Sequence, residues 1–202
     1  MGGRATDGVI LAITGASGAP YGVRALRALV EADVPVHLVV SDAAREVLRA
    51  ECGLESGDDD PTLGGTVPRG APVTRYPLRA IGAAIASGSF PARGMAVVPC
   101  SMGTLSRIAT GASSNLIERA ADVTLKERRR LVLVARETPL SLIHLRNMTA
   151  VTEAGAIVLP AAPGFYHRPT RVEELVDFVV ARTLDHLGVA HHLGKAWTGE
   201  PE

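Results

Sequence analysis

The stretch DVTLKERRRLVLVARETPLSLIHLRNM, residues 122–148, places an apolar strand between two groups of charges. Its centre, residues 131–135, is a continuous apolar run, which is typical of a strand buried on both faces of a parallel sheet. Arg136 and Glu137 follow at the carboxyl end of this strand. Ligands of open α/β sheets bind outside the carboxyl ends of the strands, so this pair is placed to meet a substrate. The preceding run KERRR is interpreted as a solvated helix end, because charge runs usually face water.

Similar apolar runs recur along the chain and alternate with helical patterns, and this alternation predicts a three-layer αβα sandwich with a mainly parallel sheet. The segment 52–75 is rich in Gly, Pro and Asp and has no periodicity, so it is predicted to be a long surface excursion. The expected strands are residues 9–13, 36–40, 95–99, 131–135 and 156–159, and the expected helices start near residues 20, 43, 102, 116 and 172.

Length and composition favour a single domain, 1–202, with a core at about 8–189 and a C-terminal tail at 190–202. Lys plus Arg and Asp plus Glu each number 21, so no net basic charge attracts nucleic acid or an anionic membrane surface. No apolar run is long enough for a membrane span or a signal peptide. Cys52 and Cys100 lack metal-ligand spacing, which argues against a zinc site and suits a reducing cytoplasm.

The loop TGASGAP, residues 14–20, leads from the first strand into a helix whose amino terminus has unpaired N–H groups. Such a turn is a candidate anion cradle. The spacing is not GxGxxG, and small-residue turns also occur in α/β domains that bind nothing there. The loop alone therefore leaves ligand binding open.

Other polar groups have a plain structural explanation beside a functional one. Ser41 and Asp42 fit a helix cap, although Asp42 also stands where a dinucleotide fold places its ribose-binding acid, which keeps an NAD-binding oxidoreductase as an alternative. Residues 58–60 (DDD) do not complete a DDxxD magnesium motif and are expected to be a solvated loop. Cys100 has no His nearby in sequence and is expected to be a small buried thiol.

Long parts of the chain closely resemble the flavin prenyltransferases of the UbiX type. The resemblance is carried by TGASGAPYG near residue 14, by residues 99–148 with the block LKERR…RETPLSLIHL, and by LPAAPGFYHRPTRVEELVDFVVARTLDHLG near the C-terminus. It implies a flavodoxin-like (Rossmann-like) subunit, often a homo-oligomer of dodecamer size, that binds FMN. The implied reaction transfers a dimethylallyl group from dimethylallyl monophosphate to N5 and C6 of reduced FMN, without metal. The prenylated FMN would serve a UbiD-type decarboxylase.

The resemblance also implies roles for individual residues. Ser17 would lie near flavin N5, Glu137 would transfer protons, and Glu51 is a weaker catalytic candidate. Several fixed cations with a phenol can stabilise charge on a leaving phosphate, as magnesium does elsewhere. The implied flavin contacts are Gly15, Ala16, Ser17, Ser41, Ser101, Met102, Thr104 and Arg136, and the implied phosphate contacts are Arg119, Lys126, Arg136, Tyr166 and Arg182, with Lys126 also counted as catalytic.

One departure concerns Ile81, which stands where many relatives have an aromatic residue that lines the prenyl site, whereas Trp197 matches an aromatic residue in some relatives. A flavin-dependent cysteine decarboxylase of the same fold is an alternative, but its PASANT-type motif is absent. The NAD-binding oxidoreductase lacks a YxxxK pair, since Ala25, Ala80 and Thr170 stand four residues after the three tyrosines.

Overall fold

The structure, a computed structural model, describes residues 7–194, so Trp197 lies outside the described residues. Strands and helices alternate as the apolar pattern predicts. The strands are β1 (Gly8–Ile13), β2 (Val36–Val40), β3 (Val73–Tyr76), β4 (Ala92–Cys100), β5 (Arg130–Ala135) and β6 (Ile157–Pro160). The helices are α1 (Ala19–Glu31), α2 (Asp42–Cys52), α3 (Met102–Ala109), α4 (Leu116–Lys126), α5 (Leu142–Glu153) and α6 (Val172–Leu187), with a short 3-10 helix η1 (Ala84–Ala86).

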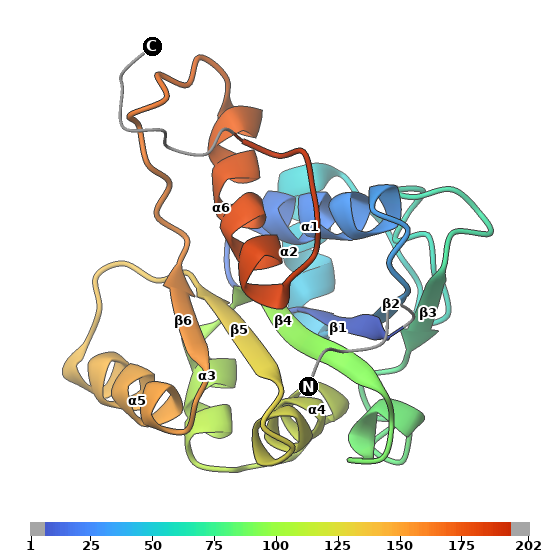
Figure 1. The fold of residues 1–202 in the computed structure, drawn as a ribbon, viewed down its shortest axis with the longest axis vertical. Helices are drawn as coiled ribbons and strands as arrows, with labels where there is room; N and C mark the ends of the chain where they lie inside the picture. Colours follow the sequence, from blue (N-terminus) through green and yellow to red (C-terminus); the bar gives the residue numbers. More distant parts are fainter. Residues whose placement is uncertain (1–6, 195–202) are drawn as a thin grey trace.

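The strands form one sheet in the order β3-β2-β1-β4-β5-β6, and every neighbouring pair is parallel (Figure 1). This confirms the predicted α/β sandwich of the flavodoxin-like, Rossmann-like class. The chain order reverses between β1 and β4, which is the switch point where doubly wound sheets bind their ligands.

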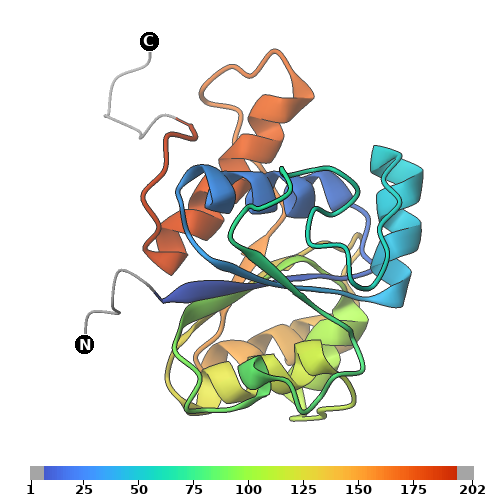
Figure 2. The ribbon, with the colours of Figure 1, turned by 90° about the vertical axis from the view of Figure 1, so that its right-hand side faces the viewer.

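Helices cover both faces of the sheet, with α1, α2 and α6 on one side and α3, α4 and α5 on the other (Figure 2). The strand β5 shows why its sequence is apolar throughout. Val132 and Val134 pack into the core on the α1 side, whereas Leu131 and Leu133 pack into the core on the α4 side. The continuous apolar run in residues 131–135 therefore serves two separate cores.

The predicted surface excursion at residues 52–75 is partly wrong. It runs into an edge strand, β3, which pairs with β2, and it buries Leu63 and Val67 in the α1-side core. Asp60 is the centre of the loop rather than a solvated charge, because its carboxylate accepts hydrogen bonds from Ser56, Thr62 and Gly64. An edge strand of four residues offers too little alternation for a sequence pattern to detect.

The helix α5 was not predicted, and it is the least embedded helix of the fold. Among its residues only Val151 is buried, whereas Leu142 and Ile143 are 61% and 68% exposed. A helix whose apolar residues face outward lacks the one-sided pattern by which helices are recognised. Among residues 7–194, no helix is long and apolar enough to cross a membrane.

Candidate functional site

Thr14 fixes the two strand ends that flank the switch point. Its hydroxyl donates a hydrogen bond to the carbonyl oxygen of Pro99 at 2.8 Å, and it accepts one from the N–H of Ser101, also at 2.8 Å. The side chain is buried, so water does not compete for these bonds. Sequence analysis did not single out Thr14, although a threonine directly after a buried strand is a signal that could have found it.

The loop after β1 is pressed against α2. A Cβ atom on Gly15 would lie 2.4 Å from that of Ala43, so only glycine permits this approach. Gly18 has φ 111°, in the left-handed region that favours glycine. Ser17, between them, is exposed, whereas Ala16 is buried. The loop thus presents the Ser17 side chain outward at the switch point.

The predicted anion cradle at the start of α1 is filled by the protein's own carboxylate. Glu51 Oε2 accepts hydrogen bonds from the N–H groups of Gly18 and Ala19, at 2.9 and 2.8 Å. Glu51 comes from the last turn of α2, and no local pattern of residues indicates that it reaches the first loop. Two N–H groups of this candidate cradle, those of Gly18 and Ala19, therefore organise the loop around Glu51.

Glu51 is held in its charged form. Partial burial is the largest single influence and raises its pKa, but hydrogen bonds from Ser17, Gly18 and Ala19 and the charge of Arg136 together lower the pKa below its usual value. Arg136 also acts on the pKa of Tyr21, which burial raises and Arg136 lowers. The structure therefore brings Ser17, Glu51 and Arg136 into one charged cluster at the switch point.

The remaining predicted flavin contacts belong to the amino termini of two helices, α2 and α3, at the carboxyl ends of the strands. Ser41 and Ser101 are the N-caps of α2 and α3, and their hydroxyls accept hydrogen bonds from Ala44 and Thr104. Met102 and Thr104 are buried in the first turn of α3. Two helix amino termini therefore lie beside the switch point, a setting that fits the phosphate group of a flavin nucleotide.

The other residues at the carboxyl edge have contrasting surroundings. Arg136 and Glu137 are both exposed, and Glu137 accepts a hydrogen bond from the N–H of Thr138 at 3.0 Å. Cys100 is buried as expected, and burial raises the pKa of its thiol to about 12. A thiol with such a pKa is not a nucleophile at neutral pH.

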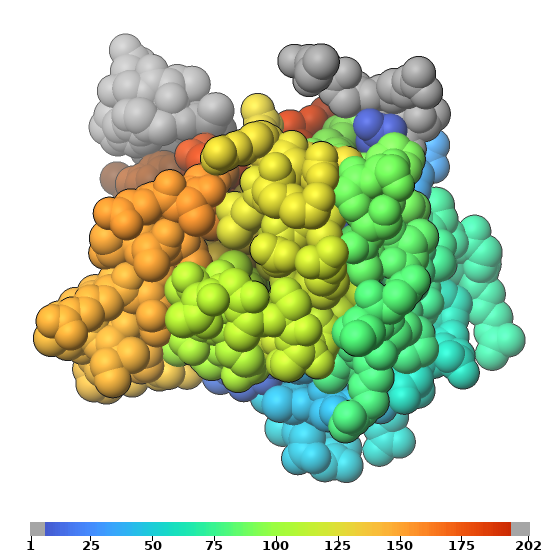
Figure 3. Space-filling model, turned by 90° about the horizontal axis from the view of Figure 1, so that it is seen from below, coloured from blue at the N-terminus to red at the C-terminus, as the bar shows by residue number. Residues whose placement is uncertain are grey.

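A second group of predicted residues lies on α4 and the segment 78–90, which run side by side on the face seen in Figure 3. A Cβ atom on Gly88 would lie 2.8 Å from Lys126 Nζ, so the turn around Gly88 packs directly against this ammonium group. The hydroxyls of Ser87 and Ser89 flank that contact and bond each other at 3.0 Å. We define this surface, Ser87–Ser89 with Arg119 and Lys126, as the α4 face.

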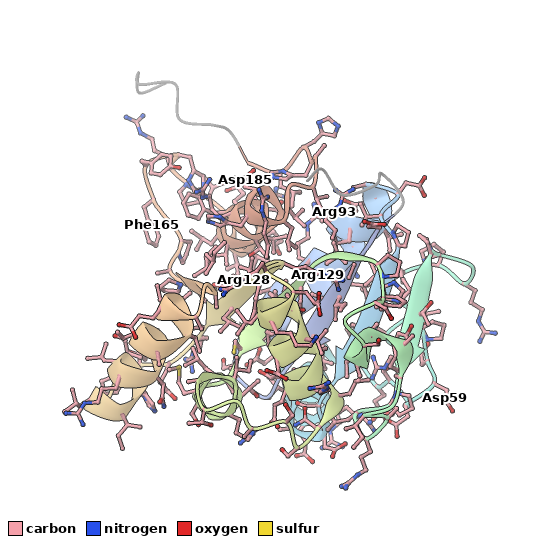
Figure 4. The ribbon with its side chains drawn as sticks, turned by 60° about the horizontal axis from the view of Figure 1, so that its bottom comes forward. Asp59, Arg93, Arg128, Arg129, Phe165 and Asp185 are labelled. Atoms are coloured by element: carbon pink, nitrogen blue, oxygen red, sulfur yellow. The ribbon has the colours of Figure 1, made fainter. Side chains whose placement is uncertain are left out.

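The charge run KERRR is exposed as predicted, except for the half-buried Arg129, but several of its side chains also bond to neighbouring segments. Lys126 ends α4 and pairs with Glu127 Oε1 at 2.5 Å. Arg129 donates to the carbonyl oxygen of Gly88, and Arg130 donates to that of His186 at the end of α6. Figure 4 shows Arg128 and Arg129 at the turn between α4 and β5. These arginines tie neighbouring segments together, which composition alone does not indicate.

Lys126 lies near the amino end of β5, and Arg136 lies at its carboxyl end. The strand β5 begins at Arg130, shortly after Lys126, and ends at Ala135, directly before Arg136. At about 3.3 Å per residue, the two ends of such a strand are roughly 20 Å apart. A phosphate group needs its cationic partners within about 3 Å. One chain therefore does not bring these two predicted phosphate contacts together.

Tyr166 and Arg182 form a third group, on the flank built by β6 and α6. The ring of Tyr166 meets that of Phe178 edge-on, with centroids 5.8 Å apart. Phe178 and Arg182 line a cavity of about 240 Å³ beside the edge strand β6. Arg182 and Arg119 are each paired on their own helix, with Asp185 and Asp122.

Ile81, which stands where many relatives have an aromatic residue, is 56% exposed within this chain.

Comparison with known proteins identifies the class. The model of the Flavoprotein family matches residues 4–184. The flavin prenyltransferase UbiX of Halalkalibacterium halodurans is 48% identical over 189 residues, which cover 93% of this chain and 92% of that protein. The flavin prenyltransferase UbiX of Pseudomonas aeruginosa is 48% identical over 194 residues, with 94% and 93% covered. This chain therefore belongs to the flavin prenyltransferase (UbiX) family of flavoproteins.

Solved structures agree. A UbiX protein in complex with FMN and dimethylallyl pyrophosphate has 43% identity and a TM-score of 0.83, covering 95% of this chain and 98% of its own. A dodecameric FMN-dependent UbiX-like decarboxylase from Escherichia coli O157:H7 has 42% identity and a TM-score of 0.86, covering 95% and 99%. The FMN-dependent cysteine decarboxylase SpaF has 13% identity and a TM-score of 0.57, which shows a shared fold alone.

Proposed function

We propose that this chain transfers the dimethylallyl group of dimethylallyl monophosphate to N5 and then to C6 of reduced FMN. The prenylated FMN would be handed to a UbiD-type decarboxylase, in the cytoplasm. The observation that carries the proposal is the Ser17, Glu51 and Arg136 cluster at the switch point of a sheet whose sequence relatives are flavin prenyltransferases.

The carboxyl edge of the sheet would hold the flavin. Ser17 and Arg136 are both exposed at the switch point, where Ser17 would hydrogen-bond the ring and Arg136 would supply a cation. Reduced FMN supplies the two nucleophilic atoms, so that a bond from N5 to C1 of the donor forms as the C1–O bond breaks and phosphate leaves. Glu137 would hold or deliver the proton that moves as the second bond forms.

The donor phosphate would be bound where subunits meet. A dianionic phosphate needs several cations at once, and within one chain Lys126 and Arg136 are roughly 20 Å apart. A head-to-tail contact that sets the α4 face of one subunit against the carboxyl edge of the next would unite them. The phosphate contacts Arg119, Lys126, Arg136, Tyr166 and Arg182 would then come from more than one chain.

Exposed apolar residues support such an assembly. Leu140, Leu142, Ile143 and Leu145 cluster around the start of α5, at the carboxyl edge, and each is more than 40% exposed. Phe165 is 68% exposed on the loop that carries Tyr166 (Figure 4). Exposed apolar surface of this kind marks protein interfaces. A homo-oligomer, of dodecamer size as in the related E. coli protein, is therefore part of the proposal.

The reaction is proposed to need no metal, because cations supplied by the protein take the place of magnesium. Among residues 7–194, His, Cys, Asp and Glu side chains form no group of three or more that could hold a metal ion. The phosphate would instead be neutralised by charge-assisted hydrogen bonds from arginine and lysine.

The test is mass spectrometry of the flavin after anaerobic incubation of the protein, reduced FMN and dimethylallyl monophosphate in the presence of EDTA. A mass gain of one dimethylallyl unit supports the proposal, and a parallel incubation with dimethylallyl pyrophosphate establishes which donor is preferred. An unmodified flavin with both donors, with and without magnesium, would overturn the proposed reaction. A strict magnesium requirement would overturn the phosphate assignments alone.

A further inference from the structure

Arg182 is paired with a carboxylate of its own helix. Its Nη1 donates to Asp185 Oδ2 at 2.8 Å, one turn further along α6. The two side chains are 54% and 46% exposed, so the pair borders solvent. An exposed pair of this type stabilises a helix only weakly. Whether the pair restrains Arg182 thus depends on what holds Asp185.

Asp185 is held by the segment after α6. Its second oxygen, Oδ1, lies 3.1 Å from His191 Nε2, and the His191 side chain is only 12% exposed. The backbone N–H of Leu193 donates to His191 Nδ1, also at 3.1 Å. Because a backbone N–H can only donate, Nδ1 is the acceptor, and a neutral ring carries its hydrogen on Nε2. That hydrogen points to Asp185.

These bonds form a continuous connection from the core to the arginine. Leu193 packs against the α1-side core, its N–H fixes His191, and His191 fixes Asp185. The Asp185 carboxylate is thereby held at both oxygens, and Arg182 Nη1 bonds to a side chain whose rotation is restrained. An unrestrained arginine loses rotamer entropy when it binds a ligand, and restraint beforehand reduces that loss.

The restraint aims Arg182 at the flank where Tyr166 lies. Arg182 lines the cavity of about 240 Å³ together with Phe178, whose ring contacts that of Tyr166. Asp185 uses Nη1, and Nε and Nη2 point away from that bond in the fixed fork of the guanidinium group. An arginine with one edge anchored can thus offer its other donors to a phosphate.

We infer that Asp185 and His191 are positioning residues that orient Arg182 for the phosphate of the prenyl donor. The inference rests on the proposed function, because it takes Arg182 as a phosphate contact. Neither residue touches the donor. Their loss is therefore expected to weaken donor binding and to leave the rate at saturating donor nearly unchanged, because the arginine itself remains present.

The experiment compares Asp185→Asn, His191→Phe and the double variant with the wild-type oligomer and with Arg182→Ala. Calorimetry measures binding of dimethylallyl monophosphate to protein loaded with oxidised FMN, and steady-state assays give the donor KM and kcat. Asp185→Asn is expected to raise the donor Kd and KM about 3- to 10-fold, with kcat within about 2-fold. His191→Phe is expected to have a smaller effect in the same direction. The double variant should match Asp185→Asn, because His191 acts through Asp185.

Asp177→Asn is the matched control. It removes a carboxylate from the same helix, but Asp177 pairs with Arg24 of α1 at 2.6 Å, whereas the partner of Arg182 is Asp185. This control should leave the donor Kd unchanged, which separates loss of helix charge from loss of orientation.

Several outcomes would overturn the inference. If Arg182→Ala weakens donor binding but Asp185→Asn does not, Asp185 has no positioning role. Tighter donor binding by Asp185→Asn would mean that the carboxylate competes with phosphate. Unaltered donor binding by Arg182→Ala would leave nothing to orient, while the proposed reaction would stand. Absence of any prenyl transfer by the wild type would overturn the proposed function, and the inference would fall with it.

Discussion

The carboxyl edge of the sheet and the α4 face differ in how much of a site one chain completes. At the carboxyl edge, Thr14 joins two strand ends, and Glu51 gathers Ser17 and the start of α1 into one hydrogen-bonded cluster. On the α4 face, the ion pairs of Lys126 and Arg119 among residues 7–194 are with Glu127 and Asp122, acids of their own segment. The carboxyl edge is internally organised, whereas the α4 face presents cations to a binding partner.

This difference indicates a division of labour. The organised edge suits a flavin that must be held rigidly, whereas the α4 face suits a phosphate that is bound only when a second subunit supplies the opposite wall. A substitution in one region should therefore leave the function of the other unaffected, and a substitution outside both should leave prenyl transfer nearly unchanged.

The largest effect is expected from Glu137→Gln, which keeps the shape of the side chain but cannot exchange a proton. Loss of general acid–base catalysis should slow the dependent step about 100-fold or more. Donor binding should be spared, and an N5-linked adduct should accumulate. Stopped-flow and quenched mass measurements with the donor titrated provide the check. A raised donor requirement with an intact saturated rate would show that Glu137 is not the proton-transfer residue.

Lys126→Ala should act through the donor instead. Removing one charge-assisted contact to phosphate costs about 1.5–3 kcal/mol, or roughly 10- to 150-fold in donor binding or first-bond formation. Both bonds to the flavin should then appear slowly, while FMN affinity stays as in the wild type. Arg69→Ala, an exposed cation of the excursion, is the control and should behave as the wild type. Equal loss of FMN affinity in Lys126→Ala would contradict the separation of the two regions.

The smallest effect on activity is expected from Asp60→Asn, outside both regions. Burial, the largest single influence, raises the pKa of Asp60, but hydrogen bonds from Thr62, Gly64 and Ser56 outweigh it and lower the pKa from 3.8 to about 2. The folded pKa lies below the unfolded one, so the stabilisation is complete above about pH 4 and is lost as the pH falls toward 2.

Asp60→Asn should therefore cost about 1–2 kcal/mol of unfolding free energy at pH 7, and progressively less below pH 4. Urea unfolding at pH 7 and pH 3 measures this, and prenyl transfer should stay within about 2-fold of the wild type. A constant difference across this pH range would refute the role of the Asp60 charge.

The sequence predicted the parts of the molecule that depend on neighbours along the chain. Continuous apolar runs identified β1, β2, β4 and β5, which are largely buried, and also the half-buried edge strand β6, whose residues are apolar although its position is peripheral. Ser41 and Ser101 stood out as polar residues after strands, and both cap helices. The edge strand β3 and the exposed helix α5 escaped, because neither has a buried face long enough to leave a pattern.

Contacts between distant segments could not be predicted from residue patterns. Nothing in the order of residues indicates that Glu51 reaches the N–H groups of Gly18 and Ala19, or that His191 reaches Asp185. Family resemblance named Lys126 and Arg136 as partners at one phosphate. The apolar run 131–135 between them already indicated that a strand separates them within one chain, but not how the two groups could meet at one phosphate.

The central claim is that the phosphate site is shared between subunits, and subunit mixing tests it most directly. Lys126→Ala and Arg136→Ala are each purified and then combined into mixed oligomers by co-expression or reversible dissociation. If Lys126 of one chain meets Arg136 of the next, random mixing creates sites in which both residues are intact, and activity should recover to about a quarter of the wild-type value. If both residues served one site within a single chain, no intact site would form. Activity that stays at the average of the two variants would contradict the account.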